Sequence, residues 1–248
     1  MLPIVVIVAV WEAWVRLRHV PLYLMPKPLA VLEGCFTEFP QLHGDIRSTL
    51  TEIGAGFLLS ICIGIPLAFL LDASAALEGA AYPFLIGSQV LPVVALAPVI
   101  IAWFGFGLTP KLVVIVIFDL FVIVLNTLAG LKSFQVEQLY LAQSMGASQS
   151  SIMLRLKVPN ALPNIFIGLK LAATFAVIGA VVGEFVSSEN GLGHAVVQAT
   201  SNFDTVTVFV AIIYLVIIGT AIYALMDGFE RLAIGWHVSR RLGRANVV

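Results

Sequence analysis

Charged residues are scarce in this chain of 248 residues. Asp, Glu, Lys and Arg together make up 11% of the sequence, whereas ordinary soluble domains carry about 25%. Hydrophobic residues make up 60%, and the mean hydropathy is +1.04. A chain with so few polar side chains cannot coat a soluble globule. The composition therefore predicts an integral membrane protein.

Cysteines and catalytic motifs are also few. Cys35 and Cys62 do not make a disulfide framework, and Cys62 lies in an apolar run, where we expect it to be a small buried hydrophobic residue. The sequence contains no C-x-x-C, no H-E-x-x-H and no serine nucleophile elbow. Four scattered histidines argue against a metal site: His19, His43, His194 and His237. We therefore expect a protein that is not an enzyme and that binds no metal or cofactor of its own.

A basic face and a phosphate-binding loop are missing as well. The net charge is −1, which argues against a nucleic-acid partner. No G-x-x-x-x-G-K-[ST] segment occurs, and Gly105–Phe106–Gly107 is a lone pair of glycines rather than a nucleotide fingerprint. Any ATP-driven function therefore needs a partner chain that binds the ATP.

Long apolar runs are abundant. A spanning helix needs about 20 mostly apolar residues, and five runs qualify: about 50–71, 81–104, 110–131, 163–186 and 205–229. The N-terminal run to Leu17 lacks a basic n-region and a small-x-small cleavage site, so it reads as a short first span rather than a signal peptide. A short amphipathic helix is expected at about 28–38. The sequence predicts an all-α membrane protein with about six transmembrane helices, residues 1–248 forming one transmembrane domain.

Lysine and arginine are unevenly distributed between the two sides that six spans define. Cytoplasmic loops carry an excess of these residues. The side with both termini holds seven of the 13 basic residues: Lys132, Arg155, Lys157, Arg231, Arg240, Arg241 and Arg244. The other side holds Arg16, Arg18, Lys27, Arg47 and Lys111, and Lys170 lies inside the fifth span. The bias predicts cytoplasmic termini and a cytoplasmic loop at about 133–160.

That loop contains the longest polar stretch, LYLAQSMGASQSSIMLRLKVPNALP at 139–163. Its first part carries apolar residues at i, i+3 spacing, which form a ridge on one helix face: Val136, Leu139, Ala142 and Met145. A solvated loop is one interpretation. A loop of about 30 residues with helices and an apolar ridge of its own is nevertheless uncommon unless it docks on a partner.

A glycine divides this loop into two predicted helices. Gly146 follows the ridge at a position where a helix end favours a left-handed residue. Ser148 or Ser150 can cap a second short helix that runs to Val158, and Pro159 is expected to end it. The pattern predicts two short helices at an angle.

The segment resembles the signature loop of ABC importer permeases, which reads Glu-Ala-Ala, three residues, Gly, nine residues, Ile, any residue, Leu-Pro. Gly146 takes the glycine position, Leu156 stands for the isoleucine, and 158–159 for Leu-Pro. Tyr140 and Leu141 replace the glutamate and the first alanine, so the acidic head is absent. The resemblance implies that the following residues couple the chain to an ATPase: Tyr140, Leu141, Ala142, Gly146, Ala147, Leu156 and Pro159.

Other stretches carry the same resemblance over most of the chain. LPVVALAPVIIAWFGFGLTPK (91–111), NTLAGLKS (126–133) and IGAVVGEFVSSENGLG (178–193) are similar to permeases for nitrate, sulfonates, taurine and pyrimidine precursors. WEAWVRLRHVPLYLMPKP (11–28) resembles their first span and loop. The resemblance implies the type I importer transmembrane fold, with a core at about 45–231 and the coupling loop at about 133–160.

The resemblance also implies partners and a place in the cell. Two copies of a cytoplasmic ABC ATPase would bind ATP and Mg, and a periplasmic or lipid-anchored binding protein would deliver the substrate. The permease would pair as a homodimer in the lipid of the bacterial inner membrane. The function implied is ATP-driven import of a small polar solute of the nitrate, sulfonate, taurine, pyrimidine or thiamine-precursor type.

A few polar residues within the spans are candidates for the translocation path. Asp119 lies near the middle of the fourth span, where a charge costs roughly 3 kcal/mol and should face protein or a water-filled cavity. It either lines the path or makes a hydrogen bond between helices. Asn126, Gln89 and Thr174 are weaker path candidates. Glu184 ends the fifth span and is expected at the outer interface, either in contact with the binding protein or simply in water.

The alternative from another class is a secondary transporter driven by an ion gradient, with Asp119 as its ion site. Such transporters usually show inverted repeats and helices broken at the midplane. Neither feature is visible in this sequence, and the loop at 133–160 would then have no purpose. The importer permease is therefore the better hypothesis.

Overall fold

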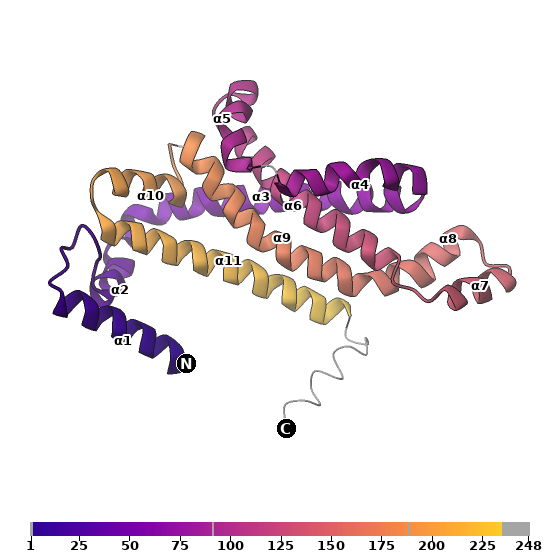
Figure 1. Cartoon of the computed structure of the whole chain (residues 1–248), viewed down its shortest axis with the longest axis horizontal. Helices are drawn as coiled ribbons and strands as arrows, with labels where there is room; N and C mark the ends of the chain where they lie inside the picture. Colours follow the sequence, from indigo (N-terminus) through magenta and orange to yellow (C-terminus); the bar gives the residue numbers. More distant parts are fainter. Residues whose placement is uncertain (1, 91, 188, 235–248) are drawn as a thin grey trace. The chain divides into compact units, whose positions relative to one another are not determined.

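The computed structural model describes residues 2–90, 92–187 and 189–234, and the regular structure within these ranges is helical throughout (Figure 1). In chain order the helices are α1 (Leu2–Leu17), α2 (Pro28–Thr37), α3 (Phe39–Asp72), α4 (Ala75–Val90), α5 (Val93–Phe104), α6 (Leu108–Leu131), α7 (Val136–Ser144), α8 (Gln149–Ile152), the π-helix η1 (Met153–Lys157), α9 (Val158–Ser187), α10 (Leu192–Ser201) and α11 (Thr205–Ala233).

Four helical stretches in the described part of the chain are long and apolar enough to cross a bilayer. They are α3, the continuous stretch Gln149–Val186 that contains α9, α6 and α11. Helix α1, expected as the first span, has 16 residues and so covers about 24 Å, less than the roughly 30 Å of hydrocarbon. The described residues thus contain four spans, or five if α4 and α5 make one, rather than six.

The third expected span is interrupted. We expected one helix at 81–104, whereas α4 ends at Val90 and α5 begins at Val93. Pro92 lies in the interruption, and it has no N–H to donate to a continuing helix. Pro83 and Pro98, in contrast, lie inside α4 and α5.

The chain divides into two compact units that share the four long helices. The first comprises residues 1–56, 93–115 and 177–219, and the second comprises 57–92, 116–176 and 220–248. Val31, Leu42, Ala195 and Val210 form a buried cluster in the first unit. The second unit has its own buried cluster, made by α3, α4 and α6: Ala68, Leu71, Leu85, Val124 and Leu128.

Small residues allow α6 to approach its neighbours closely. In the second unit a Cβ placed on Gly64 of α3 would lie 2.8 Å from Ile123, and one on Gly168 of α9 would lie 2.7 Å from Asn126. In the first unit a Cβ on Gly179 would lie 2.9 Å from Ile115. Such contacts are typical of helices that pack in a membrane, where small side chains let backbones come together.

Candidate functional site

The loop expected to couple to an ATPase consists of two short helices joined at a glycine. Helix α7 ends at Ser144, and Gly146 has a left-handed φ of +76°. The Gly146 N–H donates to the Gln143 carbonyl, and the Ala147 N–H donates to the Ala142 carbonyl at 3.0 Å. This is the Schellman arrangement that ends a helix at a glycine. The helix–glycine–helix geometry expected from the sequence is present in this segment.

Helix α8 begins where a serine can cap it. The backbone of Ser148 is extended, and its hydroxyl accepts a hydrogen bond from the Ser151 N–H at 3.3 Å. Ser148 therefore fills the N-cap role that the sequence left open between it and Ser150.

The end of the second helix differs from the expectation. We expected Pro159 to stop it, but α8 continues through the π-helix η1 into α9 without a break. The Val158 N–H bonds to the Met153 carbonyl five residues back, and Pro159 follows in the first turn of α9. A π-turn shifts the hydrogen-bond ladder by one residue, and a proline is tolerated in the first turn of a helix. The expectation of a stop at Pro159 was wrong.

Apolar side chains of this loop point away from the rest of the chain. Tyr140, Leu141 and Met145 are exposed, Met145 by 78%. α7 has no buried residue among those described. Figure 1 shows α7 and α8 as two short helices set at an angle between α6 and α9. A cluster of exposed apolar residues on a polar loop is typical of a protein-binding surface.

The remaining coupling candidates lie closer to the body of the second unit. Ala142, Ala147, Leu156 and Pro159 are half-buried. Two lysines anchor the ends of the loop: Lys157 Nζ lies 2.7 Å from Asp72 Oδ2 at the end of α3, and Lys132 pairs with Glu78 of α4. These anchors were not foreseen, because the paired residues are 85 and 54 positions apart in the sequence.

Asp119 is wholly buried. Its exposure is 0%, and the side chain that approaches its carboxyl group is Ser60 of α3. Neither carboxyl oxygen makes a hydrogen bond of standard geometry among the described residues. The residue therefore faces protein rather than lipid, as the cost of a charge within a membrane requires.

The other path candidates lie on α4, α6 and α9. The Asn126 amide donates to the Val122 carbonyl, and its side chain lines a cavity of about 410 Å³ together with Glu78, Tyr82 and Lys132. Thr174 is exposed on α9 and bonds to the carbonyl of the preceding turn. Gln89 ends α4, but its side chain lies outside the described residues.

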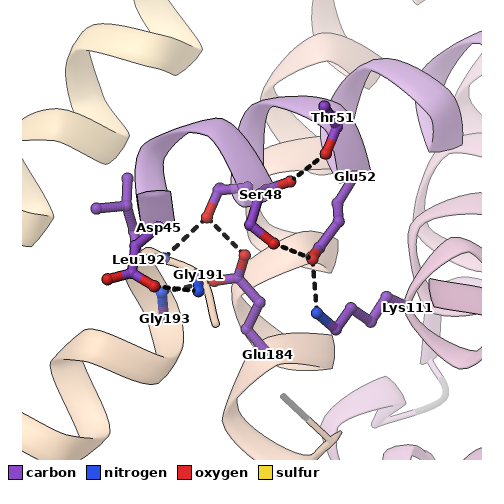
Figure 2. Close-up of polar contacts among 10 residues, drawn as sticks. Asp45, Ser48, Thr51, Glu52, Lys111, Glu184, Gly191, Leu192 and Gly193 are labelled. Carbon is purple, nitrogen blue, oxygen red and sulfur yellow. Dashed lines mark hydrogen bonds and ion pairs between the residues drawn. The ribbon is translucent and has the colours of Figure 1, made fainter. Parts of the chain in front are cut away.

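Glu184 is not in water as expected. Its side chain is 1% exposed, and both carboxyl oxygens accept hydrogen bonds: Oε1 from the Thr49 hydroxyl at 2.6 Å and Oε2 from the Gly193 N–H at 2.6 Å (Figure 2). A Cβ on Gly191 would lie only 2.3 Å from Oε1. The expectation of an interfacial carboxylate was wrong, because the loop before α10 folds back over Glu184. Any effect of Glu184 on a binding protein would have to act through this loop.

The start of α3 completes the polar cluster around Glu184. Asp45 accepts a hydrogen bond from the Gly191 N–H at 2.7 Å, and the Thr49 hydroxyl accepts one from the Leu192 N–H at 2.8 Å. Nearby, Lys111 Nζ lies 2.6 Å from Glu52 Oε1 in a buried ion pair (Figure 2). The sequence analysis did not identify Glu52. The signal that could have found it is a Glu and a Lys in apolar surroundings, since each needs a partner of opposite charge.

A third group of charges lies where α9 and α11 meet in the second unit. Lys170, left unassigned inside a span by the sequence, pairs with Glu230 at 2.7 Å and Asp227 at 3.7 Å. Asp227 also pairs with Arg231. The charge that looked isolated in the sequence is therefore neutralised by the end of the last helix.

Long apolar helices, two of which are connected by an exposed helix–glycine–helix loop, are the architecture of an integral membrane protein. Residues 60–234 match the family described as binding-protein-dependent transport system inner membrane component. The chain belongs to this family. Membership implies an ATPase partner and a substrate-binding protein. It argues against the alternative of a secondary transporter driven by an ion gradient.

Named relatives agree with this membership. The chain is 35% identical to the formylaminopyrimidine transport permease protein ThiX of Halalkalibacterium halodurans, over 93% of this chain and 92% of the relative. It is 35% identical to the riboflavin transport system permease protein RibX of Chloroflexus aurantiacus, over 92% and 86%. It is 28% identical to the taurine transport system permease protein TauC of Escherichia coli, over 94% and 87%.

The fold also has a solved counterpart. A chain of the MetNI methionine ABC transporter in an inward-facing conformation aligns with a TM-score of 0.69 and 19% identity. The alignment covers 80% of this chain and 98% of that one. The all-α fold class expected from the sequence is confirmed as that of an ABC importer permease.

Proposed function

We propose that this chain is the membrane-spanning half of an ATP-driven importer for a small polar solute. Two copies would form the path, two cytoplasmic ATPase subunits would bind ATP and Mg, and a periplasmic or lipid-anchored binding protein would supply the solute. The C-terminus and the loop at 133–160 would lie in the cytoplasm. The solute would belong to the nitrate, sulfonate, taurine or pyrimidine and thiamine-precursor group. The names of the relatives, which include a formylaminopyrimidine and a taurine permease, support this range.

The observation that best supports the proposal is the bend at Gly146. It presents Tyr140, Leu141 and Met145 to the outside on a segment that is anchored to α3 and runs into α9 without a break. A force applied to α7 and α8 would therefore reach α9 directly. We propose that the coupling residues named from the resemblance dock in a cleft of the ATPase and transmit its closure in this way.

Substitution of Gly146 tests the coupling role. A β-branched residue at φ +76° is strained, by about 1–2 kcal/mol, while nothing within 4 Å in this chain would clash with its Cβ. We expect Gly146→Val to insert into the membrane at normal levels but to lose ATPase association or substrate-stimulated hydrolysis. Pull-down of the ATPase and hydrolysis in liposomes, with and without loaded binding protein, measure this.

Gly146→Ala and Gly44→Ala are the graded controls. Alanine enters the left-handed region at a lower cost than valine, so Gly146→Ala should be milder. Gly44 is an exposed position in α3 with free space around a Cβ, and Gly44→Ala should leave coupling unchanged. Normal association together with normal stimulation in Gly146→Val would mean that the segment is a solvated loop, and the proposal would fail.

A further inference from the structure

The first unit contains a polar cavity that the coupling role does not use. Its volume is about 450 Å³, within the range of roughly 300–1,000 Å³ that is usual for small-molecule sites. It lies between the start of α3 and the start of α6. Six of the residues that line it carry the argument: Ser48, Thr51, Glu52, Phe106, Lys111 and Glu189. None of the six belongs to the coupling loop at 133–160.

The charges around this cavity are predominantly negative. Its one lysine, Lys111, is paired with Glu52, and the Ser48 hydroxyl donates to the same carboxyl oxygen at 3.0 Å. The other oxygen, Glu52 Oε2, is buried and accepts no hydrogen bond of standard geometry from a described residue. Glu189 adds a second, exposed carboxylate to the wall. An anionic ligand would meet repulsion here, whereas groups that donate hydrogen bonds would find acceptors.

An aromatic ring belongs to the lining of the cavity. Phe106 lies in the turn between α5 and α6, between two glycines with left-handed φ values of +76° and +115°. The ring is 82% exposed and still belongs to the cavity lining. An exposed ring beside hydrogen-bond acceptors suits a planar ligand, which could stack on it while its polar edge faces the carboxylates.

We propose that this cavity binds a small planar heteroaromatic amine and rejects organic anions such as sulfonates. Phe106 stacks on the ring, and Glu189 with the hydroxyl groups of Ser48 and Thr51 faces its amino and ring-nitrogen edge. The buried Lys111–Glu52 pair forms a floor without a free positive charge for an anion. This inference rests on the proposed importer function and narrows its substrate class to the pyrimidine type.

Two probes of matched shape test the chemistry. Full-length permease in lipid nanodiscs, without binding protein or ATP, is titrated calorimetrically with 4-aminopyrimidine and with pyrimidine-4-carboxylate. We expect saturable binding of the amine and binding of the carboxylate that is at least about tenfold weaker. Glu189→Gln should reduce this ratio, because it removes the exposed negative charge. Equal binding of both probes, or no saturable binding of the amine, would overturn the assignment.

Phe106 variants test the stacking role. We expect Phe106→Ala to weaken binding of 4-aminopyrimidine about tenfold, whereas Phe106→Tyr retains it. Phe203→Ala is the matched control, since Phe203 is 73% exposed in the same unit but does not line the cavity. Equal binding by the two alanine variants would overturn the proposal. So would a Phe106→Ala variant that binds the probe normally but no longer docks the binding protein, since Phe106 would then be a protein contact.

Failure of the cavity proposal can be distinguished from failure of the importer proposal. Phe106 and Glu189 are remote in sequence from the coupling loop, so their variants should retain the ATPase in a pull-down. Loss of probe binding with normal ATPase association supports the cavity. Failure of the Gly146 variants to affect coupling would remove the importer proposal whether or not the probe binds.

Discussion

The role of a buried carboxyl group depends on which hydrogen-bond donors surround it. Glu184 and Asp119 are both almost fully buried, yet Glu184 accepts two short hydrogen bonds, whereas neither carboxyl oxygen of Asp119 accepts a hydrogen bond of standard geometry from a described residue. A buried acceptor that loses its donors, or a donor that loses its acceptor, costs about 1–3 kcal/mol. The two sites should therefore respond differently to isosteric and to truncating substitutions.

Truncation of Glu184 should loosen the loop before α10. Glu184→Ala leaves the Thr49 hydroxyl and the Gly193 N–H without their acceptor, and we expect a loss of about 2–6 kcal/mol, taken as two such groups. Glu184→Gln keeps one acceptor oxygen and should cost less. Thermal unfolding of the purified protein in detergent measures the order wild type, Gln, Ala. An alanine variant as stable as wild type would show that these hydrogen bonds do not hold the loop.

Asp119 is expected to act between helices rather than on the path. Asp119→Asn keeps a polar group beside Ser60, so assembly and uptake should stay close to wild type. Asp119→Leu loses that contact and should lower the amount of assembled complex, with uptake per complex unchanged. Uptake in liposomes, normalised to complex content, decides the matter. Normal assembly with abolished uptake in Asp119→Asn would place the residue on the path instead.

Among the helices, the continuous run from α8 into α9 determines how a movement of the loop would reach the membrane-spanning part of the chain. The π-turn at Met153–Lys157 carries the helix past Pro159, so the coupling loop and the transmembrane part of α9 form one stretch, Gln149–Val186. Lys157 lies in the π-turn and holds it against the end of α3. A single ion pair therefore ties the coupling helix to a second long helix.

Removal of one member of this pair should uncouple hydrolysis from transport. Asp72 is only 3% exposed, so Lys157→Met leaves a buried carboxylate without its counter-charge, which is strongly destabilising for a buried pair. We expect ATPase association to persist while uptake per ATP hydrolysed falls several-fold. The double variant Lys157→Met, Asp72→Asn removes the uncompensated charge and should recover part of the loss. No recovery in the double variant would mean that the lysine acts by some contact other than this pair.

At the scale of the whole molecule, the topology determines which end of the long helices meets the ATPase. The proposal places the coupling loop in the cytoplasm and the loops around α10 on the outer side. The bias of basic residues supports this orientation, although Arg240, Arg241 and Arg244 lie outside the described residues.

Cysteine labelling tests the orientation. In a background with Cys35 and Cys62 replaced by alanine, a cysteine at Ser148, which is exposed, should react with a membrane-impermeant maleimide only after the cytoplasmic side is opened. A cysteine at Asn202, exposed after α10, should react in intact cells. The reverse pattern would invert the topology and exclude contact between the loop and a cytoplasmic ATPase.

Much of the fold could be predicted from the sequence, because hydropathy and the residues that begin or end a helix are local properties. The runs at 110–131 and 205–229 became α6 and α11 with ends within a few residues. The bend at Gly146 and the serine cap of α8 followed from the chemistry of single residues. The break at Pro92 and the passage of the helix through Pro159 could not be predicted in this way. The effect of a proline depends on which hydrogen bond the surrounding helix can give up.

The partners of the polar residues were decided by the tertiary structure alone. Thr49 and Glu184 are 135 positions apart, and Glu52 and Lys111 are 59 apart, so no local pattern connects them. Hydropathy indicates that such residues must be shielded from lipid, but not by which neighbour. The sequence by itself determined that this chain spans a membrane and carries a polar loop of two short helices joined at Gly146. Whether a given carboxyl group faces water, a cavity or another helix depended on how the long helices pack, since packing brings distant residues within hydrogen-bond distance.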